Sequence, residues 1–251
     1  MASEVVSYAL ILGWSGVLQT MNRLIKILCV FASVSTIAFA ADMQKLDDRI
    51  NAAHAVLHEL MDTPDKGVPD DIAAKATCVA VIPSFKKGAF VVGGQYGQGV
   101  LSCRTAHGWS APVFIQMTGA SFGLQAGGQA TDLVLVATNR DGFQRLLKDK
   151  VKLGGDAAVA AGPVGRNTQA STTELANAAF LSYSRSRGVF AGIDLTGDVV
   201  NQNQDDTRTY YGKDLSYETI LTGRVPVPPS ATHFVRTVSE LFHAAARRKQ
   251  S

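Results

Sequence analysis

Charged side chains are scarce in this sequence, and neither sign dominates. Of the 251 residues, 18% are Asp, Glu, Lys or Arg, and the 24 basic residues exceed the 21 acidic ones by only 3. A protein that binds nucleic acid needs a concentrated basic face to neutralise phosphates, so we exclude nucleic acid as a partner. The 46% of apolar residues predict one large globular domain or at most two small ones.

Signals of catalysis and metal binding are also few. We expect no nucleophile elbow and no cysteine activated by a nearby base. His54 and His58 stand one helical turn apart but lack the H-E-x-x-H pattern, so we interpret them as surface histidines. Residues 93–99, GGQYGQG, have the order G-x-x-G-x-G rather than that of a dinucleotide loop. These features predict a protein that is not an enzyme and uses no cofactor or metal.

Oxygen-bearing side chains alternate in the polar stretch of residues 201–206, NQNQDD. A calcium loop needs a glycine at its sixth position and a glutamate at its end, and here those positions hold Asp206 and Gly212. We therefore interpret this stretch as a solvated turn.

A signal peptide is predicted at residues 21–41. Arg23 and Lys26 precede an uncharged apolar run, and residues 38–40 have the small-x-small pattern of a cleavage site. We interpret residues 1–20 as an extra N-terminal segment or a misassigned start, with translation beginning at the next methionine. A long two-part hydrophobic anchor is the alternative.

Export would leave residues 42–251 as one domain with two cysteines, Cys78 and Cys103, in an oxidising compartment. Both lie in apolar surroundings. They form a disulfide if they lie on neighbouring strands, and otherwise they are buried free thiols. We expect the protein in the periplasm or elsewhere in the cell envelope, or secreted.

Hydrophobic periodicity predicts an α+β fold. Apolar residues at three- and four-residue steps predict amphipathic helices at residues 42–62 and from Ala231 onward, with a short helix at residues 70–76. Short β-rich runs separated by glycines at residues 77–137 predict an antiparallel meander. Another helix is predicted from Phe143 to a glycine at position 154. The expected fold is thus a glycine-rich antiparallel meander flanked by N- and C-terminal amphipathic helices.

Four long segments carry a family resemblance. They are DKGVPDDIAAKATCVAVIPSFKKGAFVVGGQYGQGVLSCR, GWSAPVFIQMTGASFGLQAGGQATDLVLVATN, LGGDAAVAAGPVGR and LSYSRSRGVFAGIDLTGDVV. In this order they resemble the SYLF domain, also known as the actin-regulator domain of yeast Las17-binding proteins. The resemblance covers about residues 52–242.

This resemblance implies a lipid-binding module, with phosphoinositide binding in eukaryotic members and actin binding in fungal ones. Bacterial members resemble exported envelope proteins, and the predicted signal peptide places this chain with them. The first predicted helix has an acidic polar face, which differs from the membrane-inserting helix attributed to some relatives.

Arg185 and Arg187 alternate along an extended segment, so they share one face. Two neighbouring guanidiniums repel each other unless an anion or carboxylates lie between them, and phosphate suits their bidentate fork. We predict an anionic headgroup site at these arginines. Further cations beside predicted turns or strand ends would join it: Lys86, Lys87, Arg104 and Arg166. The alternative is an internal ion-pair network with Asp132, Asp194 or Asp198.

From the sequence we therefore expect an exported, non-enzymatic SYLF-like domain that binds an anionic lipid or a membrane surface in the cell envelope. The first alternative is a structural or protein-interaction module, with an envelope protein as its partner and the arginines internal. The second is a hydrolase whose site is assembled from residues distant in the sequence.

Overall fold

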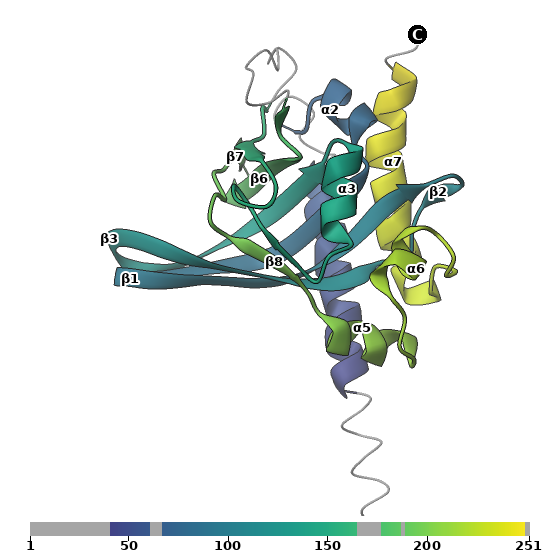
Figure 1. Ribbon diagram of the computed structural model, residues 1–251, viewed down its shortest axis with the longest axis horizontal. Coiled ribbons are helices and arrows are strands. Elements are labelled where there is room, and N and C mark those ends of the chain that lie inside the picture. Colours follow the sequence, from purple (N-terminus) through teal and green to yellow (C-terminus); the bar gives the residue numbers. More distant parts are fainter. Residues whose placement is uncertain (1–40, 61–66, 165–176, 187–188, 249–251) are drawn as a thin grey trace, which may run out of the picture. The chain divides into compact units, whose positions relative to one another are not determined.

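The computed structural model describes residues 41–60, 67–164, 177–186 and 189–248 (Figure 1). The chain divides into two compact units, residues 1–45 and 46–251. Of the first unit only residues 41–45 are described, and they are helical. The second unit begins with helical residues 46–60, called the N-terminal helix below.

The second unit combines helices with an eight-stranded sheet, which confirms the predicted α+β class. After the N-terminal helix, its helices are α2 (Asp70–Lys75), α3 (Arg140–Leu146), α5 (Gln204–Tyr211), α6 (Tyr217–Leu221), the 3₁₀ helix η1 (Pro229–Ala231) and α7 (Thr232–Arg248). Its strands are β1 (Cys78–Thr105), β2 (Gly108–Trp109), β3 (Val113–Ala137), β4 (Lys150–Lys152), β5 (Val159–Ala161), β6 (Phe180–Ser186), β7 (Val189–Gly192) and β8 (Val199–Gln202). Among the described residues, no helix has the length and apolar character needed to cross a bilayer.

Two long strands replace the short ones expected from the glycine spacing, so that expectation was wrong. β1 has 28 residues and β3 has 25, and they pair antiparallel from Cys78↔Ala137 to Leu101↔Val113. The glycines provide close approach rather than breaks. A Cβ added at Gly97 would lie 2.5 Å from Ile82 Cγ2, and one added at Gly99 would lie 2.1 Å from the carbonyl oxygen of Val81. The ribbon of β1 and β3 therefore bends back until the two ends of β1 adjoin.

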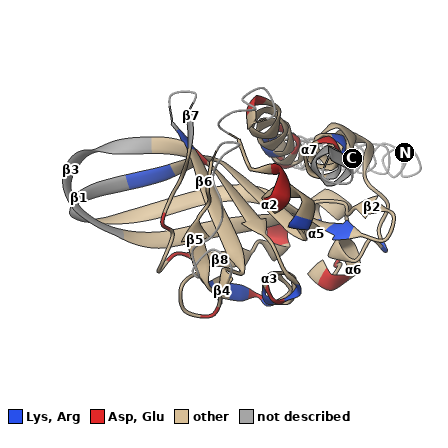
Figure 2. Cartoon of the chain, turned by 90° about the horizontal axis from the view of Figure 1, so that it is seen from above, with Lys and Arg blue, Asp and Glu red and all other residues tan. Residues whose placement is uncertain are grey.

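Each half of this ribbon has its own neighbours in the sheet. Residues 132–137 of β3 pair with β6, whereas residues 115–118 pair with β8, which in turn pairs with β4. Helix α7 lies on one side of the sheet, and α3 and α6 lie on the other (Figure 2). The pairs are antiparallel, as predicted, except that β5 runs parallel to β6.

The helix predicted from Phe143 to position 154 was wrong in its second half. α3 ends at Leu146, and β4 follows, with Val151 buried between the exposed Lys150 and Lys152. This alternation has the period of a strand, and pairing with β8 satisfies the backbone that a longer helix would have used.

The solvated turn predicted at residues 201–206 was also wrong. β8 extends to Gln202, and Asn203 is the N-cap of α5, with its Oδ1 accepting a hydrogen bond of 3.1 Å from the Asp206 backbone N–H. Asn is among the preferred N-cap residues, and acidic residues in a first turn favour a helix. The sequence signal was therefore a helix start rather than a loop.

Candidate functional site

The six cations predicted to form one headgroup site do not come together among the described residues. Arg166 and Arg187 lie outside the described part of the chain. Arg104 and Arg185 are engaged with groups at different places in the unit, as set out below. Lys86 and Lys87 follow each other on β1, where Lys86 is exposed and Lys87 is half-buried.

Arg185 on β6 is part of an internal network, as the alternative interpretation proposed. Its Nη2 lies 2.7 Å from Asp132 Oδ2, its Nε donates to the same oxygen at 3.0 Å, and its Nη1 pairs with Glu59 of the N-terminal helix. Asp132 Oδ1 accepts a hydrogen bond of 2.9 Å from the backbone N–H of Ser84. Ser84 has a φ of 53° at a bulge of β1, so the network fastens an irregular bend to β3, β6 and a helix.

Arg104 is likewise used inside the fold. Its Nε donates to the carbonyl oxygen of Ala76 at 2.9 Å, and its Nη2 donates to that of Phe242 on α7 at 3.3 Å. The guanidinium lies 5.0 Å from the ring centroid of Trp109, a cation–π distance. Burial lowers the pKa of this guanidinium. Arg104 therefore joins the end of α2 to α7.

The charge of Lys87 lowers the pKa of two carboxyl groups, those of Asp194 and Asp198. Asp198 is buried, and this burial, with repulsion from Asp194, raises its pKa to about 6, although Lys87 opposes the shift. The pKa of Asp194 is lowered, chiefly by hydrogen bonds from Thr196. A Cβ added at Gly119 would lie 1.5 Å from Asp198 Oδ1, so the carboxylate packs directly on the β3 backbone.

Cys78 and Cys103 form a disulfide. They lie on the two halves of the one long strand β1 rather than on two different strands. Next to them, the backbone N–H of Arg104 donates to the carbonyl oxygen of Thr77 at 2.7 Å. The bond therefore closes the bent ribbon at the point where the ends of β1 adjoin.

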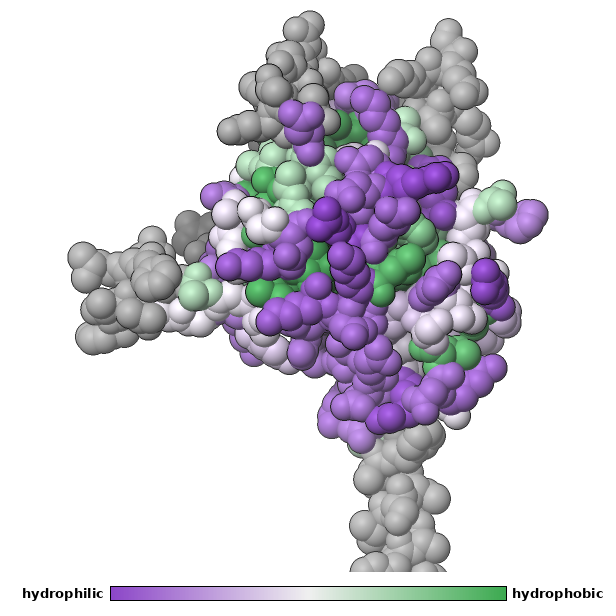
Figure 3. Space-filling view, in the orientation of Figure 1, coloured by the Kyte–Doolittle hydropathy of each residue, from purple (hydrophilic) through white to green (hydrophobic). Residues whose placement is uncertain are grey.

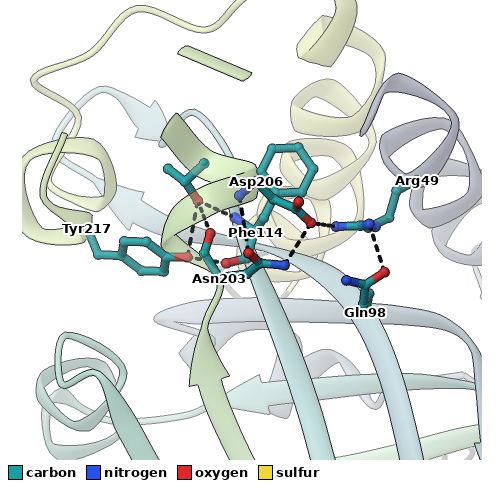
Figure 4. Close-up of polar contacts among 7 residues, drawn as sticks. Arg49, Gln98, Phe114, Asn203, Asp206 and Tyr217 are labelled. Carbon is teal, nitrogen blue, oxygen red and sulfur yellow. Dashed lines mark hydrogen bonds and ion pairs between the residues drawn. The ribbon is translucent and has the colours of Figure 1, made fainter. Parts of the chain in front are cut away.

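A second polar network joins the N-terminal helix to the start of α5 (Figure 4). Arg49 Nη1 lies 2.5 Å from Asp206 Oδ2, and its Nη2 donates to Gln98 Oε1 on β1 at 2.9 Å. Asn203 Nδ2 donates to the same Asp206 oxygen at 2.7 Å. The Arg49 guanidinium also lies 5.5 Å from the ring centroid of Phe114 on β3. Its partners are the side chains of the fold itself, so this arginine holds the helix on the sheet.

Beside the Arg49–Asp206 ion pair, two hydroxyl groups form hydrogen bonds with the backbone of Phe114 on β3 (Figure 4). Thr207 Oγ1 accepts from the Phe114 backbone N–H at 3.2 Å, and the Tyr217 hydroxyl donates to the Phe114 carbonyl oxygen. The Thr207 and Tyr217 hydroxyls lie 3.1 Å apart. Burial raises the pKa of Tyr217 to about 12, so its hydroxyl stays a hydrogen-bond donor at neutral pH.

Three histidines lie at the contact between the N-terminal helix and α7. His54 is half-buried, its Nδ1 lies 3.0 Å from Thr237 Oγ1, and its ring centroid is 6.1 Å from that of His58 and 6.2 Å from that of His233. α7 therefore covers part of His54, whereas His58 is exposed, as expected for a surface histidine. Within the described ranges, no group of three or more His, Cys, Asp or Glu residues could hold a metal ion.

Ser121 lies in a sequence pattern that is shared with catalytic serines. Residues 119–123 read GASFG and match G-x-S-x-G, the pattern of a nucleophile elbow, which turns sharply from a strand into a helix. Here Gly119, Ala120 and Ser121 pair in sequence with Gln95, Gly94 and Gly93 inside the β1–β3 ribbon. The segment continues as a strand, so its backbone is not that of an elbow.

Two exposed lysines on β4 were not singled out by the sequence analysis. Lys150 and Lys152 on β4 are exposed and share one face, with the buried Val151 between them pointing to the other. β4 pairs with β8. On the side of the molecule drawn in Figure 3, hydrophilic residues cover most of the described surface and hydrophobic residues form separate patches.

Comparison with known proteins gives the family. The profile described as "Ysc84: Las17-binding protein actin regulator" matches residues 118–241. LAS seventeen-binding protein 3 of Saccharomyces cerevisiae is 34% identical over 178 residues, covering 69% of this chain and 39% of that protein. SH3 domain-containing YSC84-like protein 1 of Rattus norvegicus is 36% identical over 170 residues, covering 67% and 50%. The chain thus spans half or less of the length of these relatives. The chain belongs to the Ysc84 family, whose shared module is the SYLF domain.

Proposed function

We propose that this protein is a non-enzymatic module that binds anionic lipid at a membrane surface of the cell envelope. The observation that carries the proposal is the pair Lys150 and Lys152, exposed on one face at the sheet edge. Arg104 and Arg185 are committed to internal groups, so these lysines take the place of the predicted headgroup site. Lysines near an anionic membrane each contribute about 1 kcal/mol of attraction.

The family supports a binding role rather than a chemical one. The yeast relative is named for binding Las17, and the mammalian relative carries an SH3 domain in its name. We extend this only to the class of function: a module that holds another component in place. The continuous strand at residues 119–123 fits this proposal, because it offers no elbow for a nucleophile.

Export is a separate part of the proposal. It is supported by the basic, apolar and small-residue pattern of residues 21–41. Mass spectrometry of the protein recovered from the envelope of its native cells should find Ala41 or Asp42 as the first residue. Recovery of the chain with residues 1–20 intact would refute both export and the internal start.

A protein-interaction module is the second candidate function, and one observation favours it. Arg185 is paired with Asp132 and Glu59, as expected if the arginines are structural. The partner would then be an envelope protein. Under this alternative, the purified protein would bind neither neutral nor anionic lipid vesicles.

Co-sedimentation with vesicles separates the two candidates. The protein would be mixed with phosphatidylcholine vesicles and with vesicles that also contain phosphatidylserine. We expect binding to the second kind and little binding to the first, because only the anionic surface attracts lysines. Absence of binding to both would favour the protein-interaction module.

A further inference from the structure

The strand register places the two lysines in a larger open face. Directly opposed residues of paired strands share one face of a sheet. One row across four strands therefore consists of Tyr96 on β1, Thr118 on β3, Val199 on β8 and Lys152 on β4. The row beside it consists of Gln98, Gln116, Asn201 and Lys150. Gly94 and Ala120 form the start of a third row.

The exposure of these residues shows how far the face is open. Tyr96 is 46% exposed and is the large hydrophobic residue that stands out as exposed among those described. Gly94, Ala120, Lys150 and Lys152 are exposed as well. At Gln98 the face meets the N-terminal helix, through the hydrogen bond from Arg49. The open part thus extends from the helix toward the bend of the ribbon.

The chemistry of the face is uneven. Lysines stand at one edge, an aromatic residue stands at the other, and Thr118 and Val199 lie between them. The residues of the three rows include no carboxylate. At the usual spacing of strands, the row from Tyr96 to Lys152 is about 14 Å wide. This surface has a positive edge and an amphipathic edge.

We propose that this face, here called the Tyr96–Lys152 face, is the surface on which the protein lies against an anionic bilayer. The inference rests on the proposed function and adds the site. A tyrosine combines an apolar ring with a polar hydroxyl, and such rings settle at the level of lipid headgroups. Lysines reach the same level with their charge in water. The three rows carry two positive charges and no carboxylate, so they attract an anionic surface, although the exposed Asp156 accepts the backbone N–H of Lys152 at 2.8 Å beside them.

A lysine substitution with a matched control tests the electrostatic half of this proposal. Lys150→Gln with Lys152→Gln removes both positive charges of the face, whereas Lys75→Gln with Lys213→Gln removes two exposed charges elsewhere. On phosphatidylcholine vesicles that contain phosphatidylserine, the first pair should weaken partitioning about 25-fold, since each lysine contributes about 5-fold. The second pair should leave partitioning within about 2-fold of the parent protein, because those lysines lie outside the face.

A fluorescence probe tests the orientation. Tyr96→Trp places an indole at the edge of the face, and its emission should shift to shorter wavelength when vesicles containing phosphatidylserine are added, as the ring leaves water. The same vesicles added to the parent protein give the background from its own two tryptophans, Trp14 and Trp109. Circular dichroism of each variant shows whether it is folded.

The outcomes separate this inference from the proposed function. Selective loss in Lys150→Gln with Lys152→Gln, together with the emission shift, supports the face. If the parent binds anionic vesicles but both lysine pairs bind equally well and the emission does not shift, the face is wrong while lipid binding stands. If the parent binds no vesicles, the proposed function itself fails.

Discussion

Arg185 Nη2 lies 2.7 Å from Asp132 Oδ2, and the carboxylate of Asp132 also accepts the backbone N–H of Ser84 at 2.9 Å. The arginine thus neutralises an acid whose other oxygen holds a bulge of β1 in place. The Arg185 and Asp132 side chains are 20% and 15% exposed, so removing one partner leaves a charge with little access to water.

Loss of the Arg185 side chain should therefore destabilise the fold. We expect Arg185→Ala to lower the free energy of unfolding by about 2–4 kcal/mol, since breaking a mostly buried pair leaves an uncompensated charge. Lys86→Ala, two strands away on an exposed site, should change it by less than about 0.5 kcal/mol. Urea unfolding followed by circular dichroism measures both. Equal stability of the two variants would show that the pair contributes nothing.

The disulfide predicts a specific labelling pattern. When the protein purified from its native cells is denatured without reductant and alkylated, peptides with Cys78 and Cys103 should carry no label, and both should be labelled after reduction. Replacing both with alanine should cost about 3 kcal/mol, because the closed loop has a sequence separation of 25. Complete labelling before reduction would mean that the thiols are free in the cell.

Asp198 should destabilise the fold at neutral pH. Its pKa is raised from 3.8 to about 6. At a pH between these two values, the folded state therefore still holds a proton that the unfolded state has lost. Stability from this group is therefore present below about pH 4 and lost as the pH rises through 6. Asp198→Asn should stabilise the protein by about 1–3 kcal/mol at pH 7 and hardly at all at pH 4. A variant no more stable at pH 7 would contradict the assigned cause.

His54 should lower the stability of the fold at acidic pH, whereas Asp198 lowers it at neutral pH. Its pKa is lowered by burial and by His58 and His233, with Glu240 opposing, so below about pH 6.5 the unfolded state takes up the proton first. Stability from His54 is present above that pH and lost as the pH falls. His54→Gln should flatten the dependence of unfolding free energy on pH in this acidic range. If the His54→Gln variant kept the pH dependence of the parent protein, the effect could not be assigned to His54.

The sequence predicted the α+β class and the terminal helices because their periodicity is local. It did not predict the long bent ribbon, because the glycines of residues 93–99 could mark either turns or close packing. Contacts between Gly97 and Ile82, distant along the strand, decide between these. A single sequence gives no such contact.

The candidate site was harder to predict than the fold. Arg185 lies on an extended strand, as predicted, but its partners Asp132 and Glu59 come from other elements. Lys150 and Lys152 lay within a predicted helix, and residues two positions apart on a helix do not share a face. Recognising β4 as a strand would have placed both on one face.

The most direct test of lipid binding through charge is its dependence on salt. The fraction of protein that floats with phosphatidylserine-containing vesicles would be measured at increasing concentrations of sodium chloride. We predict that binding falls steeply as salt rises, because exposed lysines are screened beyond about 8–10 Å at moderate ionic strength, and that neutral vesicles capture little protein at any salt. Binding that is unaffected by salt, or equal on neutral vesicles, would contradict the account.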